Sequence, residues 1–150
     1  MTLTQKETTL LNDLKSQEQL CIDKYTQYEK EACDPALKTI FGAIKTTEES
    51  HLATVNRILG GEEVKMSMES PAAQKAQCQP SSCSADAKKH DKFLCHDALA
   101  TEKHVSSLYN VSIFEFTSST LRDTLAHIQK EEQNHGQTLY SYMSANGMYS

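Results

Sequence analysis

The sequence predicts an all-α protein, a single domain of four helices in which one helical hairpin occurs twice. Its 150 residues are enough for one hydrophobic core, and five Gly, three Pro and no Trp leave long segments without a helix breaker. In these segments apolar residues recur at steps of three and four, the spacing of one helix face. The two halves also align without a gap at an offset of 84 residues, the separation between His51 and His135.

The first hairpin is expected over about residues 5–59. Its first helix runs from about Gln5 to Ala32, and Asp34 can then cap a second helix that stops at Gly60-Gly61. The inward positions of the first helix are Leu11, Leu14, Glu18, Cys21, Tyr25, Tyr28 and Ala32. Those of the second helix are Leu37, Phe41, Ile44, Glu48, His51, Val55 and Ile58.

The second hairpin is expected over about residues 89–146. Its first helix begins near Lys89–Lys92 and ends at about Phe116, and its second follows a cap at Ser118 or Ser119 and ends near Asn146-Gly147. The inward positions of the former are Cys95, Ala98, Glu102, Val105, Tyr109, Ser112 and Phe116. Those of the latter are Leu121, Leu125, Ile128, Glu132, His135, Leu139 and Tyr142.

Residues 60–88 break the helical periodicity and are rich in Ser, Gln, Ala and Lys, so we expect a long connection there. Extended at about 3.3 Å per residue, this segment can cross the full length of a helix of roughly 40 Å. Cys78 and Cys83 lie within it. They form a disulfide or cross-linking site or, the reading we favour, are two exposed thiols without function.

Six polar residues stand on the otherwise apolar inward faces. Each hairpin carries a Glu on its first helix and Glu-x-x-His on its second, and residues three apart share a helix face. The six residues are Glu18, Glu48, His51, Glu102, Glu132 and His135. Glu18 and Glu48 each lie roughly 22 Å from the turn between their helices, at about 1.5 Å per residue, and Glu102 and Glu132 repeat this register.

Four carboxylates and two imidazoles should therefore meet at one level inside the bundle. Left unpaired, each buried charge would cost several kcal/mol, whereas two divalent cations would balance the four carboxylates. This ligand set, with one Glu from each of two helices and Glu-x-x-His from the other two, is that of ferritin-like di-metal bundles. Nitrogen and oxygen donors suit iron best, with manganese and zinc as alternatives. The competing interpretation is a polar core or solvated faces without metal.

Residues next to this set have less specific interpretations. Cys21 is a small buried hydrophobe, with an extra ligand or redox partner as the alternative, and Tyr25 and Tyr109 are core tyrosines or partners of the site. Asp13 and Asp97 are interpreted as charges at helix ends, and contact with the metal ligands is the less favoured alternative. Surface positions are expected for His90, His96, His104 and His127.

The composition also indicates which partners to expect. The net charge is −5 with both signs interspersed, so no basic stripe suits nucleic acid, and no apolar run approaches a membrane span. The first residues lack the apolar stretch of a secretory signal, so a reducing, cytoplasmic-type compartment is the default expectation. A homodimer remains as a candidate protein partner.

Parts of the chain resemble a known family. The segments "LYNVSIFEF", "LRDTL" and "YMSANGMYS" of the second half are similar to the Coat F family of spore coat proteins, and "DPALKTIFGAIKTTEESH" in the first half is similar to the same hairpin. The resemblance implies a ferritin-like helical fold, an association with the spore coat and spore coat proteins as candidate partners. The six-ligand set also resembles that of rubrerythrin and bacterioferritin relatives.

These resemblances imply a di-metal protein that acts on dioxygen or peroxide or handles metal. Rubrerythrins usually add a carboxylate one turn along a ligand helix, where this chain has Cys21 and Val105, and the chain contains no rubredoxin module. The alternative function is a structural spore coat component whose bundle serves assembly.

Overall fold

The fold consists of four long helices. In the computed structural model of the protein, residues 1–66 and 79–149 are described. Helix α1 spans Gln5–Glu31, α2 Pro35–Leu59, α3 Ala85–Glu115 and α4 Ser119–Ala145. The described residues contain no strand, so the prediction of an all-helical chain is confirmed.

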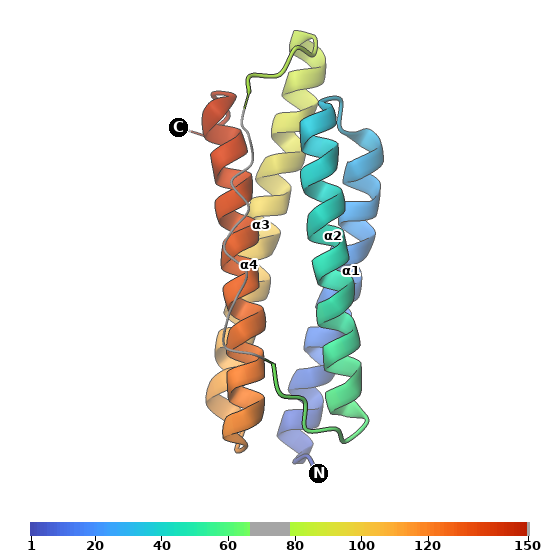
Figure 1. The fold of residues 1–150 in the computed structure, drawn as a ribbon, viewed down its shortest axis with the longest axis vertical. Helices are drawn as coiled ribbons and strands as arrows, with labels where there is room; N and C mark the ends of the chain where they lie inside the picture. Colours follow the sequence, from blue (N-terminus) through green and yellow to red (C-terminus); the bar gives the residue numbers. More distant parts are fainter. Residues whose placement is uncertain (67–78, 150) are drawn as a thin grey trace.

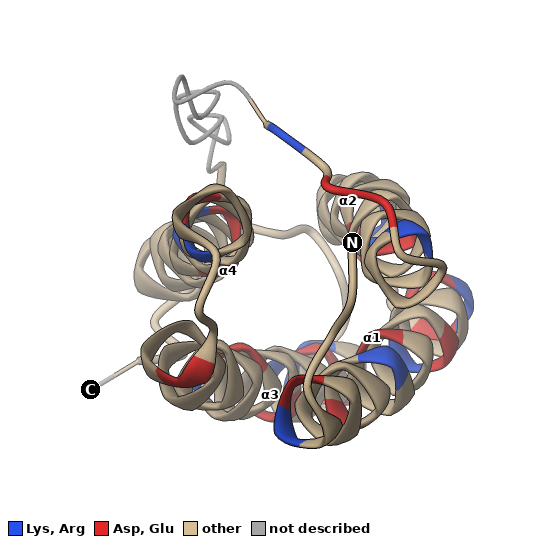
Figure 2. Ribbon diagram, turned by 90° about the horizontal axis from the view of Figure 1, so that it is seen from below, with Lys and Arg blue, Asp and Glu red and all other residues tan. Residues whose placement is uncertain are grey.

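The four helices lie side by side as a bundle (Figure 1). Each hairpin packs within itself, α1 on α2 and α3 on α4, and the two hairpins meet mainly through α1 and α3. Seen along the bundle, the order around the ring is α1, α2, α4, α3 (Figure 2). Each helix therefore directs one face to the common centre, which is the arrangement that the periodic inward positions require.

The helix ends follow from local capping chemistry. Asp34 accepts a hydrogen bond from the Ala36 N–H at the start of α2, and Ser118 accepts one from the Leu121 N–H at the start of α4. Helix α3 begins about one turn before the expected Lys89–Lys92, because Ser84 caps it by accepting from the Ala87 N–H. That first turn contains no large apolar side chain and is mostly exposed, so hydrophobic periodicity alone could not reveal it.

The core is formed by the predicted inward positions. All of them are buried except Tyr28, which is partly buried. Tyr25, Tyr109 and Tyr142 are among the largest fully buried side chains. At roughly 1.5–3 kcal/mol for each fully buried large apolar side chain, these faces are the main source of stability. The same faces carry the six polar residues into the interior.

Two buried carboxylates join the hairpins, one at each end of the bundle, and each belongs to the hairpin opposite the turn that it contacts. Glu7, in the first turns of α1, accepts hydrogen bonds from the Thr117 N–H at 2.9 Å and the Thr117 hydroxyl at 3.1 Å, between α3 and α4. Asp91, in α3, accepts from the Cys33 N–H at 2.8 Å and the Asp34 N–H at 3.1 Å, between α1 and α2. Glu7 and Asp91 are 84 residues apart, and so are Cys33 and Thr117, whose N–H groups they accept from. The internal repeat of the sequence therefore holds in three dimensions.

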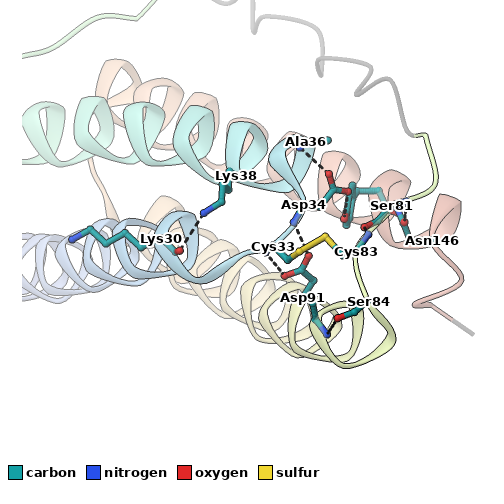
Figure 3. Close-up of a disulfide and its surroundings, with 12 residues drawn as sticks. Lys30, Cys33, Asp34, Ala36, Lys38, Ser81, Cys83, Ser84, Asp91 and Asn146 are labelled. Atoms are coloured by element: carbon teal, nitrogen blue, oxygen red, sulfur yellow. Dashed lines mark hydrogen bonds between the residues drawn. A yellow bond between two sulfur atoms is a disulfide. The ribbon is translucent and has the colours of Figure 1, made fainter.

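A disulfide joins Cys33 in the α1–α2 turn to Cys83 just before α3, with the Cα atoms 6.4 Å apart (Figure 3). The interpretation of Cys83 as a free, exposed thiol was therefore wrong, and its partner is not Cys78. The pairing was hidden because 50 residues separate the two cysteines and only the packing of the hairpins brings them together. Cys78 lies outside the described residues.

The connection from α2 to α3 starts at one end of the bundle and finishes at the other (Figure 1). In its described first part, Val64 is buried and its carbonyl accepts a hydrogen bond from the Thr124 hydroxyl of α4 at 2.7 Å. Gly61, with φ of 88°, supplies the left-handed conformation at the end of α2. None of the described helices has the length and apolar character needed to cross a bilayer.

Candidate metal centre

All six polar residues predicted from the sequence converge in the middle of the bundle. Each helix contributes at least one of them, and every one is buried, with at most 8% of its surface exposed. They are Glu18 on α1, Glu48 and His51 on α2, Glu102 on α3, and Glu132 and His135 on α4. The two imidazole rings lie 6.0 Å apart, between their centroids.

The first group of ligand atoms surrounds Nδ1 of His51. This nitrogen lies 3.0 Å from Oε2 of Glu48, 3.3 Å from Oε1 of Glu132 and 3.7 Å from Oε2 of Glu18. One carboxylate from α1, one from α2 and one from α4 thus face the same ring nitrogen. The ligand atoms that these four residues offer all lie within 4.8 Å of one another.

The second group surrounds Nδ1 of His135 and uses the opposite oxygens of two of the same glutamates. The distances are 3.2 Å to Oε2 of Glu132, 3.4 Å to Oε1 of Glu48 and 3.5 Å to Oε2 of Glu102. Glu48 and Glu132 therefore belong to both groups and present one oxygen to each. Glu18 and Glu102 each belong to one group only.

Two tyrosines hold Glu18 and Glu102, which are called the terminal glutamates because each belongs to one group only. As with Glu7 and Asp91, each contact joins the two hairpins. Tyr25 of α1 donates its hydroxyl hydrogen bond to Glu102 of α3, and Tyr109 of α3 donates to Glu18 of α1. Both tyrosines are fully buried, and burial together with the nearby carboxylates raises the pKa of each hydroxyl well above its usual value. They stay protonated and act as donors, so they fix the carboxylates that they touch.

Burial in the bundle disfavours the charged forms of these carboxylates and imidazoles. It raises the pKa of Glu18 to about 8 and that of Glu102 well above the ordinary value, and the neighbouring carboxylates add to both shifts. For His51 and His135 burial alone would lower the pKa, but the surrounding carboxylates outweigh it and raise both pKa values. Without a cation, the cluster therefore retains protons at neutral pH.

The donor set fits two divalent cations. One oxygen of each glutamate is buried without a hydrogen-bond partner among the described residues: Glu18 Oε2, Glu48 Oε1, Glu102 Oε2 and Glu132 Oε1. A single N–H at each Nδ1 can donate well to one oxygen, so the other two oxygens that face it need another positive partner. A cation bound by one imidazole and three carboxylates would supply that partner at each group.

Comparison with known proteins bears on the second hairpin. Residues 90–150 match the Coat F domain. The match covers most of α3 and all of α4, including three of the six residues, namely Glu102, Glu132 and His135. The resemblance of the second half to this family is thereby confirmed. No curated protein and no solved structure matches the chain.

Glu131 and His127, both within the Coat F segment, lie next to the centre, and the sequence analysis did not connect them with it. Oε2 of Glu131 lies 2.7 Å from Nε2 of His51, and its Oε1 lies 2.7 Å from Nε2 of His127. The expectation of a surface position for His127 was wrong, because its side chain is only 10% exposed. The i,i+4 spacing of His127 and Glu131 was the one available signal, but it is common on solvated helices.

The other residues that the sequence analysis considered near the ligands do not belong to either ligand group. Asp97 accepts from Lys24 at 3.1 Å and from the Tyr28 hydroxyl, so it joins α3 to α1 rather than acting as a helix-end charge. Asp13 is exposed. Cys21 is buried, its pKa is raised by burial, and it lies outside both ligand groups. A protonated thiol in that position behaves as a small apolar side chain.

Proposed function

We propose that the protein is a ferritin-like di-metal carboxylate protein that holds two divalent cations in the centre of its bundle. The observation that supports this most directly is the sharing of Glu48 and Glu132, each of which presents one oxygen to each imidazole. Carboxylates placed in this way can bridge two cations. Iron is the preferred metal for such nitrogen and oxygen donors, followed by manganese and zinc.

The roles of the residues follow from their positions. His51 and Glu18 would complete one cation position and His135 and Glu102 the other, with Glu48 and Glu132 common to both. Tyr25 and Tyr109 would keep the terminal glutamates in place, and the apolar side chains around them would exclude water. Bound iron would supply electron transfer to dioxygen or peroxide, which the side chains alone cannot provide.

The surroundings of the ligands favour oxidase or metal-handling activity over peroxide reduction of the rubrerythrin kind. Such proteins usually carry an added carboxylate one turn along a ligand helix. Here the corresponding places hold Cys21 and Val105, both buried and neither a carboxylate. Among the described residues, the two groups of candidate ligands contain only the six residues already named.

A structural role in the spore coat is the second candidate, and the Coat F match supports an association with the spore coat. In this alternative the bundle serves assembly, and any bound cation stabilises the fold without turning over. The Cys33–Cys83 disulfide supports a location in an oxidising environment, because disulfides persist outside reducing compartments.

Elemental analysis of the purified protein, followed by assays with dioxygen and peroxide, would separate the candidates. The proposal expects two cations per chain and oxidation of added Fe²⁺ by the protein. Two bound cations without redox cycling would favour the structural role. A protein that binds no cation after incubation with Fe²⁺, Mn²⁺ or Zn²⁺ would overturn the di-metal proposal.

A further inference from the structure

The two imidazoles differ in what contacts their outer nitrogen. Nε2 of His51 lies 2.7 Å from Oε2 of Glu131, whose other oxygen lies 2.7 Å from Nε2 of His127. Nε2 of His135 has no hydrogen-bond partner within residues 1–66 and 79–149. The side chain of His51 is 1% exposed, whereas that of His135 is 10% exposed.

The sequence explains this difference. At the offset of 84 residues, the counterpart of Glu131 is Thr47 and the counterpart of His127 is Ala43. The Thr47 hydroxyl donates to the Ala43 carbonyl of its own helix at 3.4 Å, and neither side chain is a carboxylate or an imidazole. The six ligands repeat between the halves, but the Glu–His pair behind one of them occurs only on α4.

An ionised carboxylate can only accept hydrogen bonds, so Glu131 requires the proton of His51 to be on Nε2. The lone pair of the neutral imidazole is then on Nδ1, the atom that faces Glu18, Glu48 and Glu132. Such a carboxylate behind a histidine fixes the tautomer and the ring orientation and increases the basicity of the ligating nitrogen. His127 in turn contacts the second oxygen of Glu131, so both oxygens of this carboxylate are held by an imidazole.

We propose that Glu131 is a positioning residue that makes the two cation positions unequal, so that the position containing His51 binds its cation more tightly and fills first. The inference rests on the proposed di-metal function and concerns the order of loading. Among the described residues, no carboxylate holds the outer nitrogen of the His135 ring in this way. Binding at that position should therefore be the weaker, second step.

Titration of the metal-free full-length protein with Co²⁺, followed by native mass spectrometry and visible absorption, tests this order. Wild type should bind in two resolved steps. Glu131→Gln keeps the size of the side chain but removes its charge, and it should weaken the first step by about 10- to 100-fold while leaving the second unchanged. Thr47→Glu places a carboxylate at the corresponding position behind His135 and should strengthen the second step.

His51→Ala and His135→Ala assign the two steps. The tight step should disappear in the former and remain in the latter, and circular dichroism and thermal unfolding of each metal-free variant check the fold. The inference is overturned if wild type binds two Co²⁺ equally, if Glu131→Gln weakens both steps alike, or if the tight step belongs to His135. Absence of Co²⁺ binding in wild type would instead reject the di-metal function itself, and the inference with it.

Discussion

At the scale of single residues, the centre is defined by the number of carboxylate oxygens around each ring nitrogen. Nδ1 of His51 and Nδ1 of His135 each face three oxygens, but each can carry only one proton. The two Nδ1–H groups therefore cannot satisfy all six oxygens, and four buried oxygens remain without a partner among the described residues. This excess of acceptors distinguishes the centre from an ordinary buried polar network.

Replacement of the shared glutamates should have the largest effect on cation binding. Glu48→Gln and Glu132→Gln each remove a charge that both positions use, so we expect neither variant to retain two cations. Glu49→Gln, one residue away on the exposed side of α2, is the matched control and should bind as wild type does. Metal content measured by elemental analysis after dialysis decides this, and two cations retained in Glu48→Gln would place the site elsewhere.

Cation binding should release protons and strengthen as the pH rises. The pKa values of His51 and His135 are raised by the surrounding carboxylates, and burial raises the pKa of Glu18 to about 8 and that of Glu102 above its ordinary value. At neutral pH these protons compete with the cation, and above the raised pKa values they no longer do.

Calorimetry of Zn²⁺ binding in buffers with different ionisation enthalpies measures the protons released. We expect net release at pH 7 and a higher apparent affinity at pH 8 than at pH 6. An affinity independent of pH over this range, without proton release, would show that the cluster holds no displaceable protons.

At the scale of elements, the ends of the helices are joined by buried carboxylates that satisfy the backbone of the opposite hairpin. Glu7 also forms a capping box with Thr4, whose N–H donates to Oε2 of Glu7 at 2.7 Å. A helix end leaves backbone N–H groups without partners inside the helix, and the turn before the next helix does the same. Glu7 and Asp91 thus connect the two hairpins through groups that would otherwise be unsatisfied.

Glu7→Gln should lower the free energy of unfolding by about 1–3 kcal/mol at neutral pH, since it weakens charge-assisted bonds to the Thr117 and Thr4 N–H groups. Burial tends to raise the pKa of Glu7, but these hydrogen bonds outweigh it and lower the pKa from 4.5. A lowered pKa stabilises the folded state above the unfolded-state value, and this contribution disappears as the pH falls through the folded-state pKa.

Urea unfolding of wild type and Glu7→Gln at pH 7 and at pH 3 measures this contribution. The difference between the two proteins should shrink at the lower pH. Glu49→Gln, at an exposed residue of α2, is the control for removal of a surface carboxylate. An equal difference at both pH values would contradict the ionic role of Glu7.

At the scale of the whole molecule, the internal repeat is nearly complete but is broken at one end. There the disulfide joins Cys33 to Cys83, whereas the counterpart of Cys33 in the second hairpin is Thr117. The same end contains Asp34, which accepts from the Tyr142 hydroxyl at 2.7 Å, and Ser81, whose N–H donates to Asn146 at 2.8 Å (Figure 3). This end therefore ties together the α1–α2 turn, the connection and the C-terminal end of α4.

Reduction of the disulfide should lower the stability of the protein by roughly 2–4 kcal/mol, because the bond closes a long loop in the unfolded chain. Cys33→Ser with Cys83→Ser should show the same loss without a reductant, and wild type in dithiothreitol should match this double variant. Cys21→Ala and Cys95→Ala test the two buried free thiols separately. Thermal unfolding that is unaffected by reduction would contradict a stabilising constraint of the bond on the unfolded chain.

Most of the helical architecture and the six candidate ligands could be predicted from the sequence. Steps of three and four place apolar side chains on one face of a helix, and the register of Glu48 and His51 against Glu18 follows from the fixed rise per residue. Repetition at one offset then distinguished these residues from chance occurrences of Glu-x-x-His. Periodicity is a local property, so one chain reveals it without knowledge of the packing.

Contacts between elements were decided only by the tertiary structure. The pairing of Cys33 with Cys83, the caps formed by Glu7 and Asp91, and the hydrogen bond from His51 to Glu131 each join residues at least 50 positions apart. No local spacing encodes such pairs, because they depend on how the two hairpins are rotated and shifted against each other. The sequence by itself therefore determined which side chains enter the interior, and the packing of the helices determined which of them meet.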